Sequence, residues 1–315
     1  MKVENNERSL KDAFYEYLHI YAIVIFTGIT IVLIIFRILL YFFEFPPFIE
    51  EAKDYDYILL IKGMDNGLVN FYDPVPGYEW PPYYLYFWYF IFYPMYLMPV
   101  YVGVYVWDII RLVVVIYIIK EAQKVFKSKF DLLLFYVVSG IAFSLDTYYG
   151  NCDFIPAFFL FQSYCSLENN KKWRSGIFFT LATFKINSIV FLPVLLLIKK
   201  IKFKDLRYYL IPFFLICLPY IIFPDYFMQM LGNWLHADEF VQGYTPFDSI
   251  FWKALQPSHL MTISFFFLCF TENIQNQKRK KQFKTIILPI LLIYYTYLTL
   301  IVFVIPVFFM GYRSF

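Results

Sequence analysis

The sequence predicts an all-α fold: a polytopic transmembrane helical bundle of about 8–11 membrane segments, some of them short or re-entrant. Of the 315 residues, 61% are hydrophobic and only 16% are charged, whereas soluble domains carry about 25% charged residues. The mean hydropathy is +0.58. The apolar stretches are continuous rather than alternating with polar residues, which disfavours an outer-membrane barrel.

The charge and cysteine patterns exclude several other classes of protein. Lysines and arginines fall in short clusters between the apolar stretches, and the net charge is only +3, so we expect no nucleic-acid partner. The four cysteines are scattered without CxxC spacing. They are expected to be small buried hydrophobes, and neither a disulfide framework nor a zinc site is expected.

The chain is predicted to form one membrane-embedded domain, residues 1–315. A first span at 20–43 is too long for the core of a signal peptide. Residues 44–82 then carry eight carboxylates and two lysines, which predicts an extracytoplasmic loop with short amphipathic helices and suggests a site rather than a linker. The family resemblance described below implies that this loop is catalytic. A second extracytoplasmic loop is expected at 224–257. The other apolar segments are 83–98, 100–119, 132–145, 154–167, 176–197, 208–223, 258–270 and 286–310.

The distribution of basic residues predicts the orientation. Four clusters hold 17 of the 27 lysines and arginines, which places these clusters in the cytoplasm and both acidic loops outside. The number of membrane crossings before the cluster at 120–129 stays open, because two full crossings at 83–98 and 100–119 would put this cluster outside. Either one of these segments is re-entrant or that cluster breaks the charge rule.

Segment 176–197 lies between two basic clusters that both favour the cytoplasm. It must therefore go out and return, with about eleven residues for each leg, fewer than the ~20 of a full crossing. Lys185 is predicted near the turn of this shallow hairpin, facing the outer side. An ammonium in an apolar segment costs ~2.5–3.5 kcal/mol, so we expect a partner, for which an anionic ligand headgroup is the obvious candidate. Simple snorkelling is the alternative.

Three further groups of residues could carry chemistry. Asp54 and Asp56, close together beyond the first span, could supply a general base or hold a divalent cation, or belong to a solvated acidic loop. The polar stretch 148–153 interrupts two apolar runs and either lines a cavity or forms an ordinary turn. His236 lies in the second loop, and Arg111 interrupts an apolar segment.

The order of these motifs resembles the GT-C glycosyltransferases, in particular the polyprenol-phosphate-mannose-dependent mannosyltransferases. The motifs are Asp-Tyr-Asp-Tyr at 54–57, Gly67 followed by Tyr72, Tyr-Glu-Trp-Pro-Pro at 78–82, Gly-Asn-Cys-Asp at 150–153, and Lys185 with Pro193. The resemblance covers residues 20–200. Two departures stand out: Asn151 replaces a usual glutamine, and Pro193 lies further from the lysine than usual.

The resemblance implies a hexosyltransferase that moves a sugar, with mannose expected, from a polyprenyl- or dolichyl-phosphate donor to a glycan or lipid-linked acceptor with inversion. It implies Asp54 as the general base, with Asp56 second, and Lys185 at the donor phosphate, with Arg111 and His236 as weaker candidates. The substrate-binding residues it implies are Tyr57, Tyr72, Glu79, Asn151 and Asp153. No metal site is assigned, and a divalent cation is left open as a cofactor.

The enzyme would be an integral, multi-pass protein of the plasma membrane or the endoplasmic reticulum membrane, in contact with membrane lipids. Its active site would face away from the cytoplasm. A polytopic transporter or lipid flippase is the main rival, because intramembrane charges also mark substrate paths. A non-catalytic membrane subunit is the third alternative.

Overall fold

The computed structural model describes residues 16–42, 55–67, 70–74, 81–126, 128–197 and 200–236. All regular elements within these ranges are helical, which confirms the predicted all-α fold. The chain divides into two units, Met1–Thr262 and Ile263–Phe315, and the described residues all belong to the first. The predicted segments at 258–270 and 286–310 lie outside them, so a single domain for the whole chain stays a prediction.

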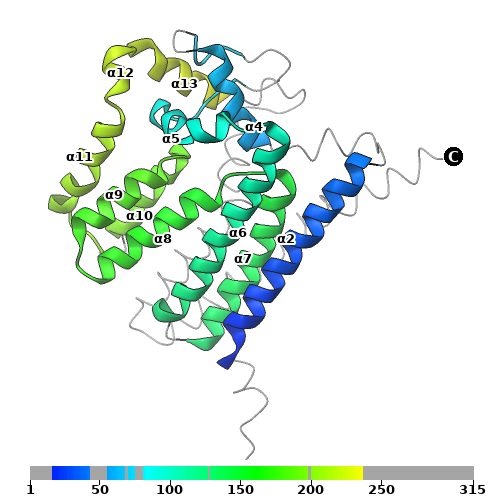
Figure 1. The fold of residues 1–315 in the computed structure, drawn as a ribbon. Helices are drawn as coiled ribbons and strands as arrows, with labels where there is room; N and C mark the ends of the chain where they lie inside the picture. Colours follow the sequence, from blue (N-terminus) through cyan, green and yellow to red (C-terminus); the bar gives the residue numbers. More distant parts are fainter. Residues whose placement is uncertain are drawn as a thin grey trace, which may run out of the picture. The chain divides into compact units, whose positions relative to one another are not determined.

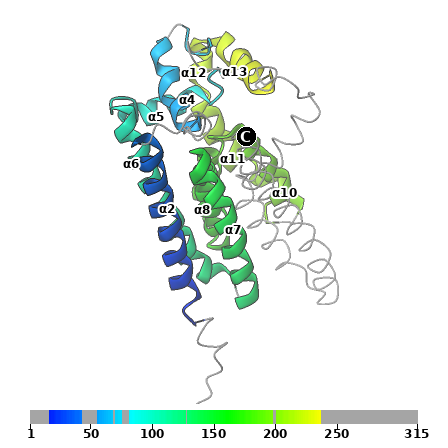
Figure 2. The ribbon, with the colours of Figure 1, turned by 90° about the vertical axis from the view of Figure 1, so that its right-hand side faces the viewer.

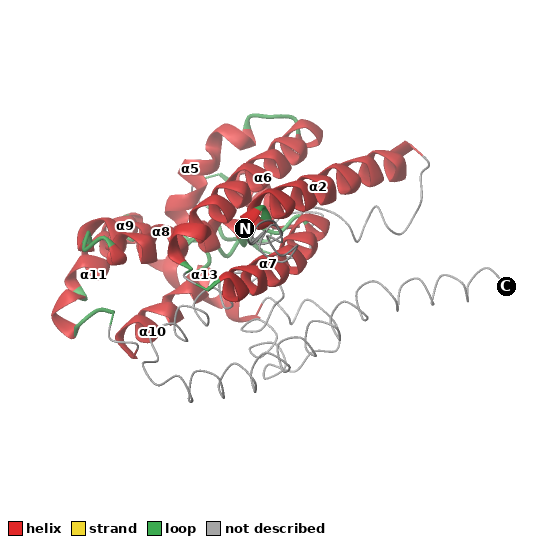
Figure 3. Cartoon of the chain, turned by 90° about the horizontal axis from the view of Figure 1, so that it is seen from below, coloured by secondary structure: helices red, strands yellow, loops and turns green. Residues whose placement is uncertain are grey.

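Three long helices lie side by side: α2 (Leu18–Phe42), α6 (Val100–Val125) and α7 (Lys129–Tyr149) (Figures 1 and 3). Helix α2 packs against α6 and α7, and every fourth residue in its first half is buried. These residues are Leu18, Ala22, Phe26 and Thr30. Within the described part of the chain, two helices are long and apolar enough to span a bilayer, Leu18–Phe36 and Val100–Val125.

The helix before α6 is much shorter. Helix α5 (Tyr86–Tyr96) has 11 residues, a length of about 16 Å, whereas the hydrocarbon core is ~30 Å thick. Pro99 then caps the start of α6. Because α5 is too short to cross alone and α6 is long enough, the helix lengths favour a re-entrant segment at 83–98 over a second full crossing. The cytoplasmic side of the cluster at 120–129 stays a prediction.

A second group of helices packs in succession, with α8 (Phe154–Glu168) against α9 (Lys172–Ala182) and α9 against α11 (Arg207–Ile216). Gly176 permits the closest approach, since a Cβ there would lie 1.7 Å from the Tyr208 carbonyl oxygen. After α9 the helix is interrupted at 183–185, the position expected for the turn of the hairpin, and the hairpin's course in the membrane stays a prediction. The chain continues through η2 (Ile186–Val190), α10 (Phe191–Leu197) and η3 (Phe203–Asp205).

The prediction of one continuous span at 208–223 is wrong. Helix α11 ends at Ile216 and is followed by the short α12 (Pro219–Ile222) and by α13 (Pro224–His236). Pro219 and Pro224 are the first residues of these two helices. Because proline lacks an amide hydrogen, it suits the first position of a helix, where that hydrogen would have no partner within the helix. Figures 1 and 2 show α12 and α13 at the same end as α4 (Tyr55–Lys62), which leads into η1 (Gly63–Asn66).

Candidate active site

The polar centre of the described structure is the junction between α7 and α8. Helix α7 ends at Tyr149, and the next residue, Gly150, has a φ of 66°, the left-handed conformation that glycine adopts without strain. The chain then turns at Asn151, whose backbone amide donates to the backbone carbonyl of Asp146 at 2.9 Å. The Asp153 amide also donates to Asp146, at Oδ1, over 3.3 Å. Asp146 therefore holds both ends of this turn, and the motif at 150–153 is an ordered loop.

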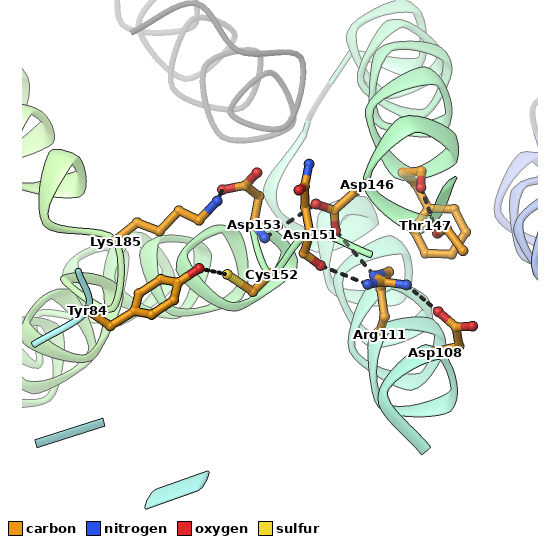
Figure 4. A network of polar contacts seen from close by, with 10 residues as sticks. Tyr84, Asp108, Arg111, Asp146, Thr147, Asn151, Cys152, Asp153 and Lys185 are labelled. Carbon is orange, nitrogen blue, oxygen red and sulfur yellow. Dashed lines mark hydrogen bonds and ion pairs between the residues drawn. The ribbon is translucent and has the colours of Figure 1, made fainter. Parts of the chain in front are cut away.

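Arg111 of α6 binds this turn from the side (Figure 4). Its guanidinium pairs with Asp108, one turn earlier on the same helix, and with Asp146 Oδ2 at 3.3 Å. It also donates to the Asn151 carbonyl at 2.7 Å. The Arg111 side chain is fully buried. Such a guanidinium needs charged partners in a low-dielectric interior, and this one has two carboxylates.

Lys185 reaches the same turn from the break after α9. Its ammonium lies 2.8 Å from Asp153 Oδ1, and the two side chains are 11% and 2% exposed. Lys185 is the residue just before η2, and its backbone is extended (φ −99°, ψ 113°). The sequence predicted a partner for this lysine, and the structure shows a carboxylate of the chain itself in contact with it.

Tyr84 connects these elements to the segment before α5. Its ring stacks on the ring of Phe184, the residue before Lys185, with ring centroids 4.7 Å apart. Its hydroxyl lies 3.2 Å from the Cys152 sulfur. Cys152 is completely buried, as expected for a small apolar residue. Segment 81–85 is thereby fixed against both the turn and the break that carry the ion pair.

A separate cluster joins the loop after η1 to α12 and α13. The Tyr72 hydroxyl donates to the Tyr84 carbonyl at 2.7 Å and lies 3.0 Å from the Tyr220 hydroxyl. Burial, followed by the neighbouring Tyr220, raises the pKa of Tyr72 well above its ordinary value, so the hydroxyl stays a donor. The Asn233 amide donates to the carbonyls of Tyr72 and Pro82, both at 2.8 Å. Both predicted outer loops therefore meet at this cluster.

The structure places the residues predicted for the site as follows. Arg111, Asn151, Asp153 and Lys185 belong to one network, whereas Tyr72 belongs to the cluster with Asn233. Tyr57 is fully buried, with its hydroxyl against Gly103 of α6. Asp56 lies in α4 and His236 ends α13, but the structure does not describe either side chain. Asp54 and Glu79 lie outside the described residues.

The sequence interpretation assigned no role to Asp108, Asp146, Tyr84 or Asn233. For Asp108 the signal was present, because a carboxylate three residues before Arg111 in an apolar stretch lies on the same helix face. Asp146 directly follows the apolar segment 132–145, so a local signal was present for it as well. No sequence pattern marked Tyr84 or Asn233, whose partners are distant in the chain. Among the described residues no group of three or more side chains could hold a metal ion. The cation alternative for Asp54 and Asp56 is untested.

A family model for glycosyltransferase family 87 matches residues 83–309. This match covers well over half of the chain and includes the complete Arg111–Asp146–Asp153–Lys185 network. The chain belongs to glycosyltransferase family 87. This is a family of the GT-C type, so the predicted class of membrane glycosyltransferase is confirmed. No curated protein and no solved structure matches the chain. The family 87 match begins at Tyr83, so it does not include the acidic loop with Asp54.

Proposed function

We propose that this family 87 glycosyltransferase takes its sugar from a polyprenyl or dolichyl phosphate and transfers it to a glycan or lipid-linked acceptor outside the cytoplasm. Mannose is the first sugar to test. Family membership supports glycosyl transfer rather than the transport or subunit alternatives. A lipid-linked donor suits a protein with apolar spanning helices, because its phosphate lies at the membrane surface while its chain dissolves in the bilayer.

The observation that carries the proposal is the position of Lys185. A lysine ammonium lies at a helix break, 11% exposed, and is bound to a buried carboxylate. Burying an ammonium is costly, and the network around Arg111 fixes the turn that carries its partner. A cation held at this place suits the phosphate of a lipid-linked donor.

The chemistry is a direct displacement at the anomeric carbon. The acceptor oxygen forms a bond to that carbon as the bond between the carbon and the phosphate oxygen breaks, and the electron pair leaves with the phosphate. A carboxylate takes the acceptor proton, with Asp54 proposed as this base and Asp56 as the second candidate. Lys185 stabilises the negative charge that develops on the phosphate. One such displacement inverts the configuration at the sugar.

We also propose that the enzyme is a multi-pass protein of the plasma membrane or the endoplasmic reticulum membrane. The hydrogen bonds of Tyr72 and Asn233 support a common side for the acidic loop and for α13, and the basic clusters support the cytoplasm for the opposite side.

The direct test supplies purified enzyme with labelled polyprenyl phosphate mannose and acceptor glycolipids, and measures transferred sugar and released polyprenyl phosphate. Lys185→Met should abolish most turnover in a folded protein, and Lys185→Arg should retain part of it. Asp54→Asn should lower kcat about 10²–10⁴-fold, as loss of a general base does, and Asp56→Asn should cost less.

The matched control is Lys124→Met, which removes an ammonium whose side chain is 70% exposed at the end of α6 and should leave turnover unchanged. Transfer from a nucleotide sugar in place of the lipid phosphate would refute the proposed donor. Normal turnover in Lys185→Met would refute its role, and a larger loss at Asp56 than at Asp54 would reverse the assignment of the base.

A further inference from the structure

Asp153 contacts the ammonium of Lys185, the group for which we propose a phosphate-binding role. It is only 2% exposed, and its Oδ1 lies 2.8 Å from Lys185 Nζ. Its backbone amide is fixed by Asp146, so the carboxylate sits on an ordered turn directly opposite the lysine (Figure 4). A phosphate that approaches Lys185 therefore meets a negative charge already bound to the same ammonium.

Arg111, the other cation in Figure 4, contacts Asp108, Asp146 and the Asn151 carbonyl. Asp153 and an arriving phosphate are both anions, and both would contact the Lys185 ammonium, so their negative charges repel each other. Any phosphate that displaces Asp153 from Lys185, or shares the ammonium with it, must overcome this repulsion.

We propose that Asp153 is the resident counter-ion of Lys185 and competes with the phosphate, so that it returns to the lysine after transfer and promotes release of the lipid phosphate product. This inference rests on the proposed lipid-phosphate donor. In this proposal Asp153 acts through Lys185 and is a positioning residue, in place of the substrate-binding role that the family resemblance implies.

The charges of donor and product explain the need for such a competitor. The donor is a phosphodiester with one negative charge, whereas the product is a monoester with about −1.5 to −2 at neutral pH. Lys185 thus attracts the product more strongly than the donor, and a lysine without a competitor would retain the product. An internal carboxylate lowers the affinity for both, because the lysine is available for only part of the time.

The test measures binding of polyprenyl phosphate, the product, to purified full-length enzyme in detergent. Asp153→Asn keeps the shape of the side chain and removes its charge, so it should bind polyprenyl phosphate at least about fivefold more tightly. In steady-state assays its KM for the donor and its kcat should both fall, and product inhibition should become stronger. A merely structural role for Asp153 would weaken binding instead.

The chain offers a matched control in a second lysine–aspartate pair. Lys172 lies 2.8 Å from Asp205, which is buried like Asp153 but joins α9 to η3. Asp205→Asn should leave the affinity for polyprenyl phosphate unchanged. The double variant Asp153→Asn, Lys185→Met should bind as weakly as Lys185→Met alone, because the competitor matters only when the lysine is present.

The outcomes separate this inference from the proposed function. If the natural enzyme does not bind polyprenyl phosphate, both fail together. If it binds, and Asp153→Asn binds equally or more weakly, the lipid-phosphate donor stands and the role of Asp153 as a competitor is refuted. An equal gain in affinity in Asp205→Asn would also refute it, because the effect would then reflect net charge alone.

Discussion

At the scale of single residues, Arg111 makes the densest set of charged contacts in the candidate site. The sequence proposed it as a weaker contact for the donor phosphate. In the structure its side chain is fully buried, pairs with two carboxylates and lies over the Phe154 ring, 5.3 Å from the centroid. With so many partners inside the protein, it suits a structural role, in which it fixes the turn at 150–153.

This role predicts that Arg111→Met destabilises the enzyme before it affects chemistry. The substitution leaves Asp108 and Asp146 buried without their cation, and breaking a buried pair in this way costs about 3–5 kcal/mol. The thermal midpoint of the purified protein should fall strongly. Adding Asp108→Leu to Arg111→Met should recover part of the loss. A normally stable Arg111→Met that cannot bind polyprenyl phosphate would instead support a direct phosphate contact.

At the scale of the helices, the packing of α9 on α11 depends on the absence of a side chain at Gly176. A Cβ there would lie 1.7 Å from a backbone oxygen of α11, and a backbone atom cannot rotate away. The hydroxyls of Ser175 and Tyr209 bond across the same contact at 2.9 Å, and Ser175 also bonds to Ser163 of α8 at 2.9 Å. These contacts fix the helix that leads directly to Lys185.

We therefore predict that Gly176→Ala separates α9 from α11 and destabilises the enzyme by about 1–3 kcal/mol or more, as overpacking does. The control is Gly140→Ala on α7, where a Cβ would make only ordinary contact with Phe26, at 3.6 Å. Thermal melting in detergent should show a clear loss for Gly176→Ala and little change for Gly140→Ala. Equal midpoints for the two variants would contradict the packing argument.

At the scale of the whole molecule, the prediction concerns orientation in the membrane. Asp65 and Lys204 are both exposed in the structure, and they lie in the acidic loop and in a basic cluster, respectively. In a cysteine-free background, Asp65→Cys should react with an impermeant reagent on intact cells. Lys204→Cys should react only after permeabilisation. The reverse pattern would overturn the proposed topology and the outer location of the active site.

The sequence by itself determined the helical class and many helix positions. Apolar runs bounded by glycine, proline and basic clusters predicted α2, α6, α7 and α8 closely, because helix formation depends on local periodicity and on residues near each end. It also predicted a helix break near Lys185 and marked 148–153 as a polar interruption between two apolar runs. Both are local signals, since a charge inside an apolar run and a glycine at a helix end can be recognised without a partner.

Only the tertiary structure decided which of these residues meet. Asp153 faces Lys185 across 32 positions of sequence, and Asn233 bonds to Tyr72 across 161. Such pairs depend on how each helix is rotated and where it crosses its neighbours, which periodicity does not encode. The breaks at Pro219 and Pro224 have a different, local cause: hydropathy alone predicted one span, but each of these prolines begins a new helix after α11. The sequence therefore supplied the charged groups of the site, and the packing of α6, α7, α8 and α9 determined their partners.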